Sequence, residues 1–117
     1  MSEPWVILTE RYGADIRNPT SAQLSEAVAG LYHETTPDRE HGSAWLRYGF
    51  DEGPMFVLDV SRNRSMRLEE WADQDCEQQL APPRTLPNVS EQLAVQALEW
   101  LAKGDIDRLR TLPWSAT

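Results

Sequence analysis

The 117-residue chain has a single cysteine, Cys76, and only two histidines, His33 and His41. One cysteine forms no intrachain disulfide and supplies no cysteine-based metal site. The two histidines lack the spacing of a zinc site. Cys76 stands between Asp75 and Glu77, whose negative charges disfavour the reactive thiolate form. We therefore expect an inert thiol, no disulfide, no metal and no other cofactor.

Long hydrophobic runs and clusters of basic residues are also missing. No apolar run approaches the roughly 18 residues that a membrane helix needs, and segment 1–4 is not followed by a signal-peptide core. Lys and Arg number 11 against 19 Asp and Glu, for a net charge of −8. This charge repels nucleic acids and anionic membranes and favours a basic partner, unless it only promotes solubility. We expect a cytoplasmic protein that binds neither nucleic acid nor membrane.

The sequence contains no recognisable catalytic arrangement. No Ser, Thr or Cys is patterned with a base and a third orienting group. Gly49 and Gly53 follow a predicted strand, but no Lys-Ser or Lys-Thr pair comes after them, so they form no phosphate loop. Glu69 and Glu70 are neighbours in a predicted strand and point to opposite faces. The sequence predicts a protein that is not an enzyme, although a deep pocket lined by His33 or His41 would reopen that question.

The residues that are present suffice for one domain spanning 1–117. Hydrophobic residues make up 40% of the chain, and five tryptophans can each bury a large area. Residues 5–9 are typical of a strand, and segment 14–17 either pairs with it or trails from it. A helix is predicted over about 20–34, capped either by Asn18 or by Thr20 in a capping box.

The middle of the chain predicts three strands of an antiparallel meander, at 44–50, 55–60 and 66–71. The second is almost continuously apolar, which indicates a central strand covered on both faces. Segment 73–84 is ambiguous, with either a fourth, edge strand at 76–80 or a connector extended by prolines. Ser90 begins a second helix that ends at Lys103 and Gly104, with one more turn over 106–110. The predicted fold is α+β, with an antiparallel meander of four to five strands and two main helices in the order β-α-β-β-β-(β)-α.

Acidic residues concentrate after the third predicted strand. Five of them lie within 69–77 without a basic residue, and two more stand at the tip of the first hairpin. These charges either protect a solvated edge strand from aggregation or complement a basic cleft on a partner, with tryptophans as anchors. The predicted partner-binding residues are Trp45, Asp51, Glu52, Glu69, Glu70, Trp71, Asp73, Asp75 and Glu77.

The tryptophans other than Trp71 have different predicted positions. Trp45 alternates with Leu46, so it either packs under a helix or is displayed. We expect Trp5 and Trp100 in the core. Trp114 is expected to seal the core near the end of the chain, because an exposed apolar end is costly in water.

The order of these motifs carries a family resemblance. A strand leads to Asn18-Pro19-Thr20 at a helix start, and a meander centred on 56–60 follows. A helix from Ser90 then runs to Trp100-Leu101, and the chain closes on Leu112-Pro113-Trp114. This pattern resembles the small α+β immunity proteins of bacterial polymorphic-toxin and contact-dependent inhibition systems, in particular the Imm family with a C-terminal tryptophan motif.

The resemblance implies a cytoplasmic antitoxin that binds one cognate secreted toxin and occludes its active site. Such toxins are often nucleases or nucleic-acid deaminases with basic clefts, which an acidic inhibitor would fit. The family supplies no shared catalytic residues to carry over. We expect a monomer rather than a dimer. The alternative is an acidic cytoplasmic secretion chaperone for an effector protein, which would be a dimer with apolar grooves.

Overall fold

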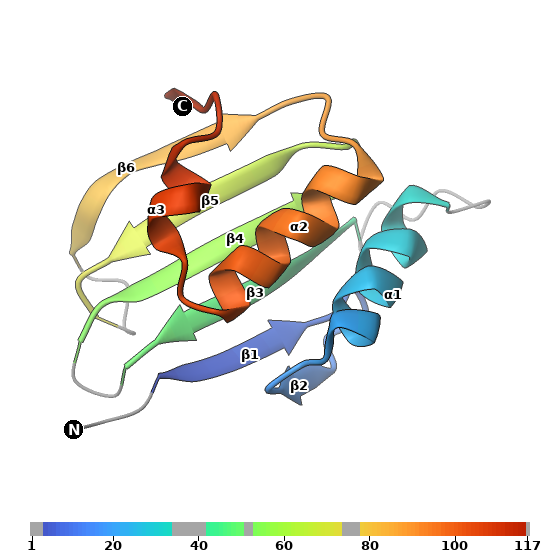
Figure 1. Ribbon diagram of the computed structural model, residues 1–117, viewed down its shortest axis with the longest axis horizontal. Helices are drawn as coiled ribbons and strands as arrows, with labels where there is room; N and C mark the ends of the chain where they lie inside the picture. The colour runs from blue at the N-terminus through green and yellow to red at the C-terminus, as the bar shows by residue number, and fades with distance from the viewer. Residues whose placement is uncertain (1–3, 34–41, 51–52, 74–77, 117) are drawn as a thin grey trace.

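The structure is a computed structural model that describes residues 4–33, 42–50, 53–73 and 78–116. The elements are β1 (Trp5–Thr9), β2 (Asp15–Arg17), α1 (Ser21–Tyr32), β3 (Ser43–Gly49), β4 (Met55–Ser61), β5 (Met66–Trp71), β6 (Gln79–Leu86), α2 (Glu91–Ala102), α3 (Ile106–Arg110) and β7 (Ser115–Ala116). Within these described ranges, the strands form one antiparallel sheet in the order β2-β1-β3-β4-β5-β6-β7. The helices lie on one face of this sheet (Figure 1).

The α+β class and the antiparallel pairing are confirmed, but the predicted count of four to five strands is wrong. Short strands account for part of the difference, because β2 pairs with β1 and β7 pairs with β6. The ambiguous segment is a strand that begins later than predicted and runs through Pro82 and Pro83. Proline is tolerated there because the pairing of β5 with β6 is irregular and β6 lies near the sheet edge.

Capping hydrogen bonds confirm both predicted helix starts. The Thr20 Oγ1 accepts a hydrogen bond from the Gln23 N–H at 3.2 Å, and the Gln23 Oε1 accepts from the Thr20 N–H at 2.9 Å. Thr20 is therefore the cap, rather than Asn18. At α2, the Ser90 Oγ accepts a hydrogen bond from the Leu93 N–H at 3.1 Å. Gly104, with a φ of 76°, follows the helix as predicted, since glycine adopts this left-handed conformation without strain.

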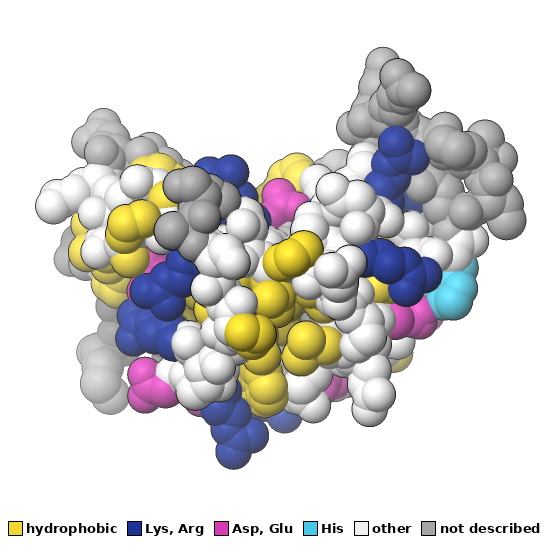
Figure 2. Space-filling model, turned by 90° about the horizontal axis from the view of Figure 1, so that it is seen from above, with side chains coloured by type: hydrophobic (Ala, Val, Ile, Leu, Met, Phe, Trp, Pro, Cys, Tyr) yellow, Lys and Arg dark blue, Asp and Glu magenta, His cyan; other side chains and the backbone are white. Residues whose placement is uncertain are grey.

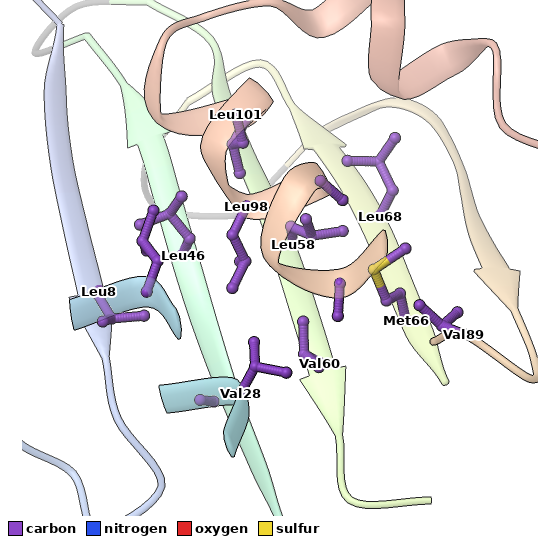
Figure 3. Packing of buried hydrophobic residues seen from close by; sticks show 14 of the residues in the cluster. Leu8, Val28, Leu46, Leu58, Val60, Met66, Leu68, Val89, Leu98 and Leu101 are labelled. Carbon is purple, nitrogen blue, oxygen red and sulfur yellow. The ribbon is translucent and has the colours of Figure 1, made fainter. Parts of the chain in front are cut away.

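The core lies between the helices and one face of the sheet (Figure 3). Leu8, Leu46, Leu58 and Leu68 are register partners on β1, β3, β4 and β5, and each is at most 1% exposed. Helix α2 places Leu98 and Leu101 over them, and α1 adds Val28. Apolar side chains at every second strand position are thus buried by the amphipathic faces of two helices.

The C-terminal end packs on this core. Trp114 is half-buried against the core cluster, and its indole N–H donates a hydrogen bond to the Leu109 carbonyl at 2.6 Å. The predicted sealing role of Trp114 is therefore confirmed. Trp100 also packs against the core, as predicted. Figure 2 looks onto the edge formed by β6 and the chain end, where hydrophobic side chains gather in the middle and Lys and Arg lie on both sides.

Candidate functional site

The second face of the sheet carries no helix among the described residues. Because side chains alternate along each strand, the residues between the core positions point to this face. Three rows of register partners cross β1, β3, β4 and β5 there: Trp5, Gly49, Met55 and Trp71; Ile7, Arg47, Val57 and Glu69; and Thr9, Trp45, Asp59 and Arg67. We call this surface the open face. It brings three of the five tryptophans together from three different strands.

A shallow hollow of about 410 Å³ lies in the open face. Its lining consists of the three tryptophans, two apolar residues and three charged residues: Trp5, Trp45, Trp71, Met55, Val57, Arg47, Asp59 and Glu69. Met55 is buried, while the indoles of the three tryptophans are half-buried. An apolar floor with a few convergent polar groups is the usual composition of a binding surface.

Trp5 lies on the open face and not in the core, so its predicted position is wrong. Its indole lies against Gly49, the residue directly opposite on β3. A Cβ added to Gly49 would stand 2.9 Å from the Trp5 Cζ2, too close for any real side chain. The glycine therefore lets the indole lie across the neighbouring strand, which fixes one end of the hollow.

Two buried donors in the hollow lack a hydrogen-bond acceptor among the described residues. They are the indole Nε1 of Trp71 and the guanidinium Nε of Arg47. Buried polar atoms are nearly always hydrogen-bonded in folded proteins, and an unsatisfied donor costs free energy. Both atoms have almost no solvent-accessible area, so they lie beneath the surface of the hollow and not at its opening.

The three charged groups of the hollow differ in their partners. The Arg47 Nη2 lies 3.8 Å from the Asp15 Oδ2, and the Glu69 Oε2 lies 3.5 Å from the Arg67 Nε. Asp59 forms no hydrogen bond or ion pair with a described residue. The pKa of Asp59 is raised to about 6, mainly by burial and also by the charge of Glu69, while the charge of Arg67 lowers it in part.

The structure brings together Trp45, Glu69 and Trp71 of the predicted binding residues. Glu70 is placed differently, on the helix-covered face, where it is 3% exposed. Its Oε1 accepts a hydrogen bond from the Arg110 Nη2 at 2.5 Å, and its Oε2 lies 3.4 Å from the Arg84 Nη2. The interpretation of Glu70 as part of an exposed acidic surface is therefore wrong, because arginines of the same chain neutralise it.

The other predicted acids lie at or beyond the ends of the described strands. Asp73 follows β5 and is half-buried. The remaining four, Asp51, Glu52, Asp75 and Glu77, lie outside the described residues.

Sequence reasoning missed Asp59, Arg47 and Trp5 as members of a site. The almost continuous apolar run of β4 predicted a strand covered on both faces, but the described helices cover only one. The signal was Asp59 itself, since a carboxylate in the middle of a central strand is unusual unless its face is solvated or bound.

A second hollow, of about 380 Å³, lies at the edge seen in Figure 2, between β6 and the chain end. Pro82, Pro83 and Trp114 line it together with Arg84 and Arg110. Both arginines are already paired with Glu70, and hydrogen bonding by Glu70 raises the pKa of Arg110. We therefore assign this edge to the attachment of the chain end rather than to ligand binding.

The described residues offer little other chemistry. They contain no group of three or more His, Cys, Asp or Glu side chains placed to hold a metal ion. His33 pairs with Glu91 across α1 and α2 on the exposed side of the helices. In the part of the chain that the structure describes, no helix has the length and apolar character to cross a membrane. Searches of protein-family models, of curated proteins and of solved structures return no match to this chain.

Proposed function

We propose that this chain is a non-enzymatic immunity protein, and that its open face binds a cognate secreted toxin and occludes the toxin's active site. One observation carries the proposal: Trp5, Trp45 and Trp71 stand together on a sheet face without a described helix over it. Tryptophans are the residues most enriched among interface hot spots. A surface that combines large aromatic side chains with charged groups is typical of the contact regions between proteins.

The dimensions of the face favour a macromolecule over a small ligand. Trp5 and Trp71 lie on strands that are three sheet spacings apart, or about 14 Å. The hollow between them is shallow, whereas small-molecule sites enclose most of the ligand. A protein surface can contact all three indoles at once, which supports occlusion of an active site by a flat, wide contact.

The distribution of charge favours a basic partner. Most of the excess negative charge of the sequence falls in segments outside the described residues, where Arg39 is the sole basic residue beside eight acids: Glu3, Glu34, Asp38, Glu40, Asp51, Glu52, Asp75 and Glu77. A nuclease or nucleic-acid deaminase has the basic substrate cleft that would complement this charge.

The test uses the protein encoded by the neighbouring upstream reading frame as the toxin. Co-expression is expected to protect cells, and purified immunity protein is expected to bind the toxin and to inhibit it. Trp45→Ala is expected to weaken binding by at least about thirtyfold, the effect of losing a hot-spot anchor of about 2 kcal/mol. Association is expected to slow as salt rises, because opposite charges steer the encounter.

Leu80→Ala is the matched control, because Leu80 is a large apolar side chain that is 54% exposed and does not line the hollow. It is expected to leave binding unchanged. Circular dichroism and thermal unfolding verify that both variants fold. Full affinity in the Trp45→Ala, Trp71→Ala double variant would exclude the open face as the interface. A complex that leaves the toxin active would exclude occlusion, and a chaperone role predicts a dimer by light scattering.

A further inference from the structure

The geometry of the open face points to a receptor for one arginine of the partner protein. We propose that the guanidinium of that arginine enters the hollow, stacks on the indole of Trp45 or Trp71 and pairs with the carboxylate of Asp59. This inference rests on the proposed function, because it assigns the arginine to the protein that covers the open face. It specifies which side chain of the partner makes the central contact.

The aromatic walls suit a planar cation. Trp45 is the direct cross-strand neighbour of Asp59, so the two side chains leave the sheet next to each other. Indole is the best aromatic acceptor for cation–π contacts, and arginine forms them more often than lysine. A guanidinium is also less strongly hydrated than an ammonium group, which eases its entry into an apolar hollow.

Asp59 is the carboxylate of the hollow that forms no ion pair with a described residue. The charged groups near it on the adjacent strands are Arg47 of β3 and Arg67 and Glu69 of β5. Arg47 is paired with Asp15, and Arg67 is paired with Glu69. A cation brought by the partner would give Asp59 the ion pair that the described residues do not supply, and the raised pKa of Asp59 agrees with the lack of such a pair.

The spread of the aromatic groups shows why the cation belongs to a polypeptide. The indoles of Trp5, Trp45 and Trp71 come from three strands, and the outer two strands lie about 14 Å apart. An arginine within a peptide donates up to five hydrogen bonds through its guanidinium, and neighbouring residues of the same peptide can contact the indoles that the guanidinium does not reach. A free inorganic cation would leave those indoles uncovered.

The probe is N-acetyl-arginine methylamide, which presents the side chain between two carbonyls, and its matched control is the neutral isostere N-acetyl-citrulline methylamide. Indole N–H signals of the folded protein are followed by NMR during titration at about pH 7.5. Saturable shifts of the Trp45 and Trp71 signals are expected, with a Kd in the millimolar range. The citrulline derivative is expected to bind at least about tenfold more weakly.

Asp59→Asn separates the ionic contact from the aromatic one. The variant is expected to lose at least about tenfold in affinity for the arginine derivative at about pH 7.5. The affinity of the wild type is expected to fall by a similar factor between about pH 7.5 and about pH 4.5, because Asp59 is protonated at the lower pH. The affinity of the variant is expected to stay the same over this range. Asp107→Asn, which removes a carboxylate that is 97% exposed on α3, is expected to change nothing.

Three results would overturn the inference: equal affinity for the two derivatives, unchanged affinity in Asp59→Asn, or no saturable shift at all. These failures differ from failure of the proposed function. If the derivative does not bind but Trp45→Ala still loses the toxin, the open face remains the interface and only its arginine receptor is excluded. If the derivative binds as expected but the open-face variants keep the toxin, the receptor stands and the proposed interface is excluded.

Discussion

The two faces of the sheet are built from the same strands but contain opposite chemistry. On the covered face, leucines from four neighbouring strands stand in register and are almost completely buried. On the open face, the intervening positions carry tryptophans, arginines and carboxylates around a shallow hollow. Because strand residues alternate, each element contributes to both surfaces at once. The first surface stabilises the fold, and the second is the one that we propose contacts another molecule.

The two faces also differ in how a carboxylate is paired. Glu70 is almost fully buried and is held by two arginines of the same chain. Asp59 is half-buried, forms no ion pair with a described residue, and has a pKa raised to about 6. A buried charge that is paired within the chain is part of the folded structure, whereas an unpaired one weakens it. The comparison indicates that the charge of Asp59 does not stabilise the fold, whereas the charge of Glu70 does.

The sharpest test of the difference between faces uses neighbouring residues of β4. Leu58→Ala on the covered face, where the side chain is 0% exposed, is expected to lower the free energy of unfolding by about 3 kcal/mol. Val57→Ala on the open face is expected to cost less than about 1 kcal/mol, because the hollow is already solvated. Urea denaturation measures both. Equal losses would mean that the open face is packed as a second core.

The sequence predicted the local elements well because their signals are local. The capping box of Thr20 and the cap of Ser90 each depend on residues only three positions apart. The strand count was wrong where the outcome depends on distant residues. Segment 79–86 forms a strand because it pairs with β5, and this pairing outweighs the low strand propensity of Pro82 and Pro83.

The candidate site was predicted only in part for the same reason. Alternation places Trp45 on one face and Glu69 opposite Glu70, but it does not say which face the helices cover. The number of acids in 69–77 suggested a continuous acidic surface. In the structure Glu70 instead lies on the core side of the sheet, where it pairs with Arg84 and Arg110, which are 14 and 40 positions away along the chain. Trp5 joins the hollow because β1 pairs with β3, a contact between segments separated by a helix.

Neighbouring glutamates of β5 test the treatment of charge. Glu70→Gln is expected to lower the free energy of unfolding by about 2 kcal/mol, because it leaves Arg110 and Arg84 without their shared counter-ion. Both arginines are partly exposed, which keeps the loss below that of a fully buried pair. Glu69→Gln is expected to cost less than about 0.5 kcal/mol, since its single ion pair with Arg67 is long, at 3.5 Å, and partly exposed to solvent. Thermal unfolding of the two variants at neutral pH compares them directly, and a larger loss for Glu69→Gln would reverse the roles assigned to the faces.

Asp59→Asn is expected to act in the opposite direction, with a gain in stability that is smaller than the losses in Leu58→Ala and Glu70→Gln. The pKa of Asp59 is about 6 in the folded protein against an ordinary value of 3.8, so the folded state binds its proton more tightly than the unfolded state. The contribution of Asp59 to stability is therefore present below about pH 4 and is lost as pH rises to about 6. The variant cannot undergo this loss. It is expected to exceed the wild type by about 1 kcal/mol at neutral pH, after allowance for solvent screening, and to differ little at about pH 4.

Urea denaturation at both pH values measures this gain, with Asp107→Asn as a control that removes an exposed acid of the same charge. An Asp59→Asn variant that is less stable at neutral pH would show that the carboxylate has a partner within the fold. A more stable variant that no longer binds the arginine derivative would combine the two results that the open face predicts. Residues at binding surfaces often lower stability, and their substitution then improves the fold while removing the function. In that case the changes in the free energy of unfolding would have opposite signs in Asp59→Asn and Glu70→Gln. The same loss of a negative charge would stabilise the protein on the open face and destabilise it on the covered face.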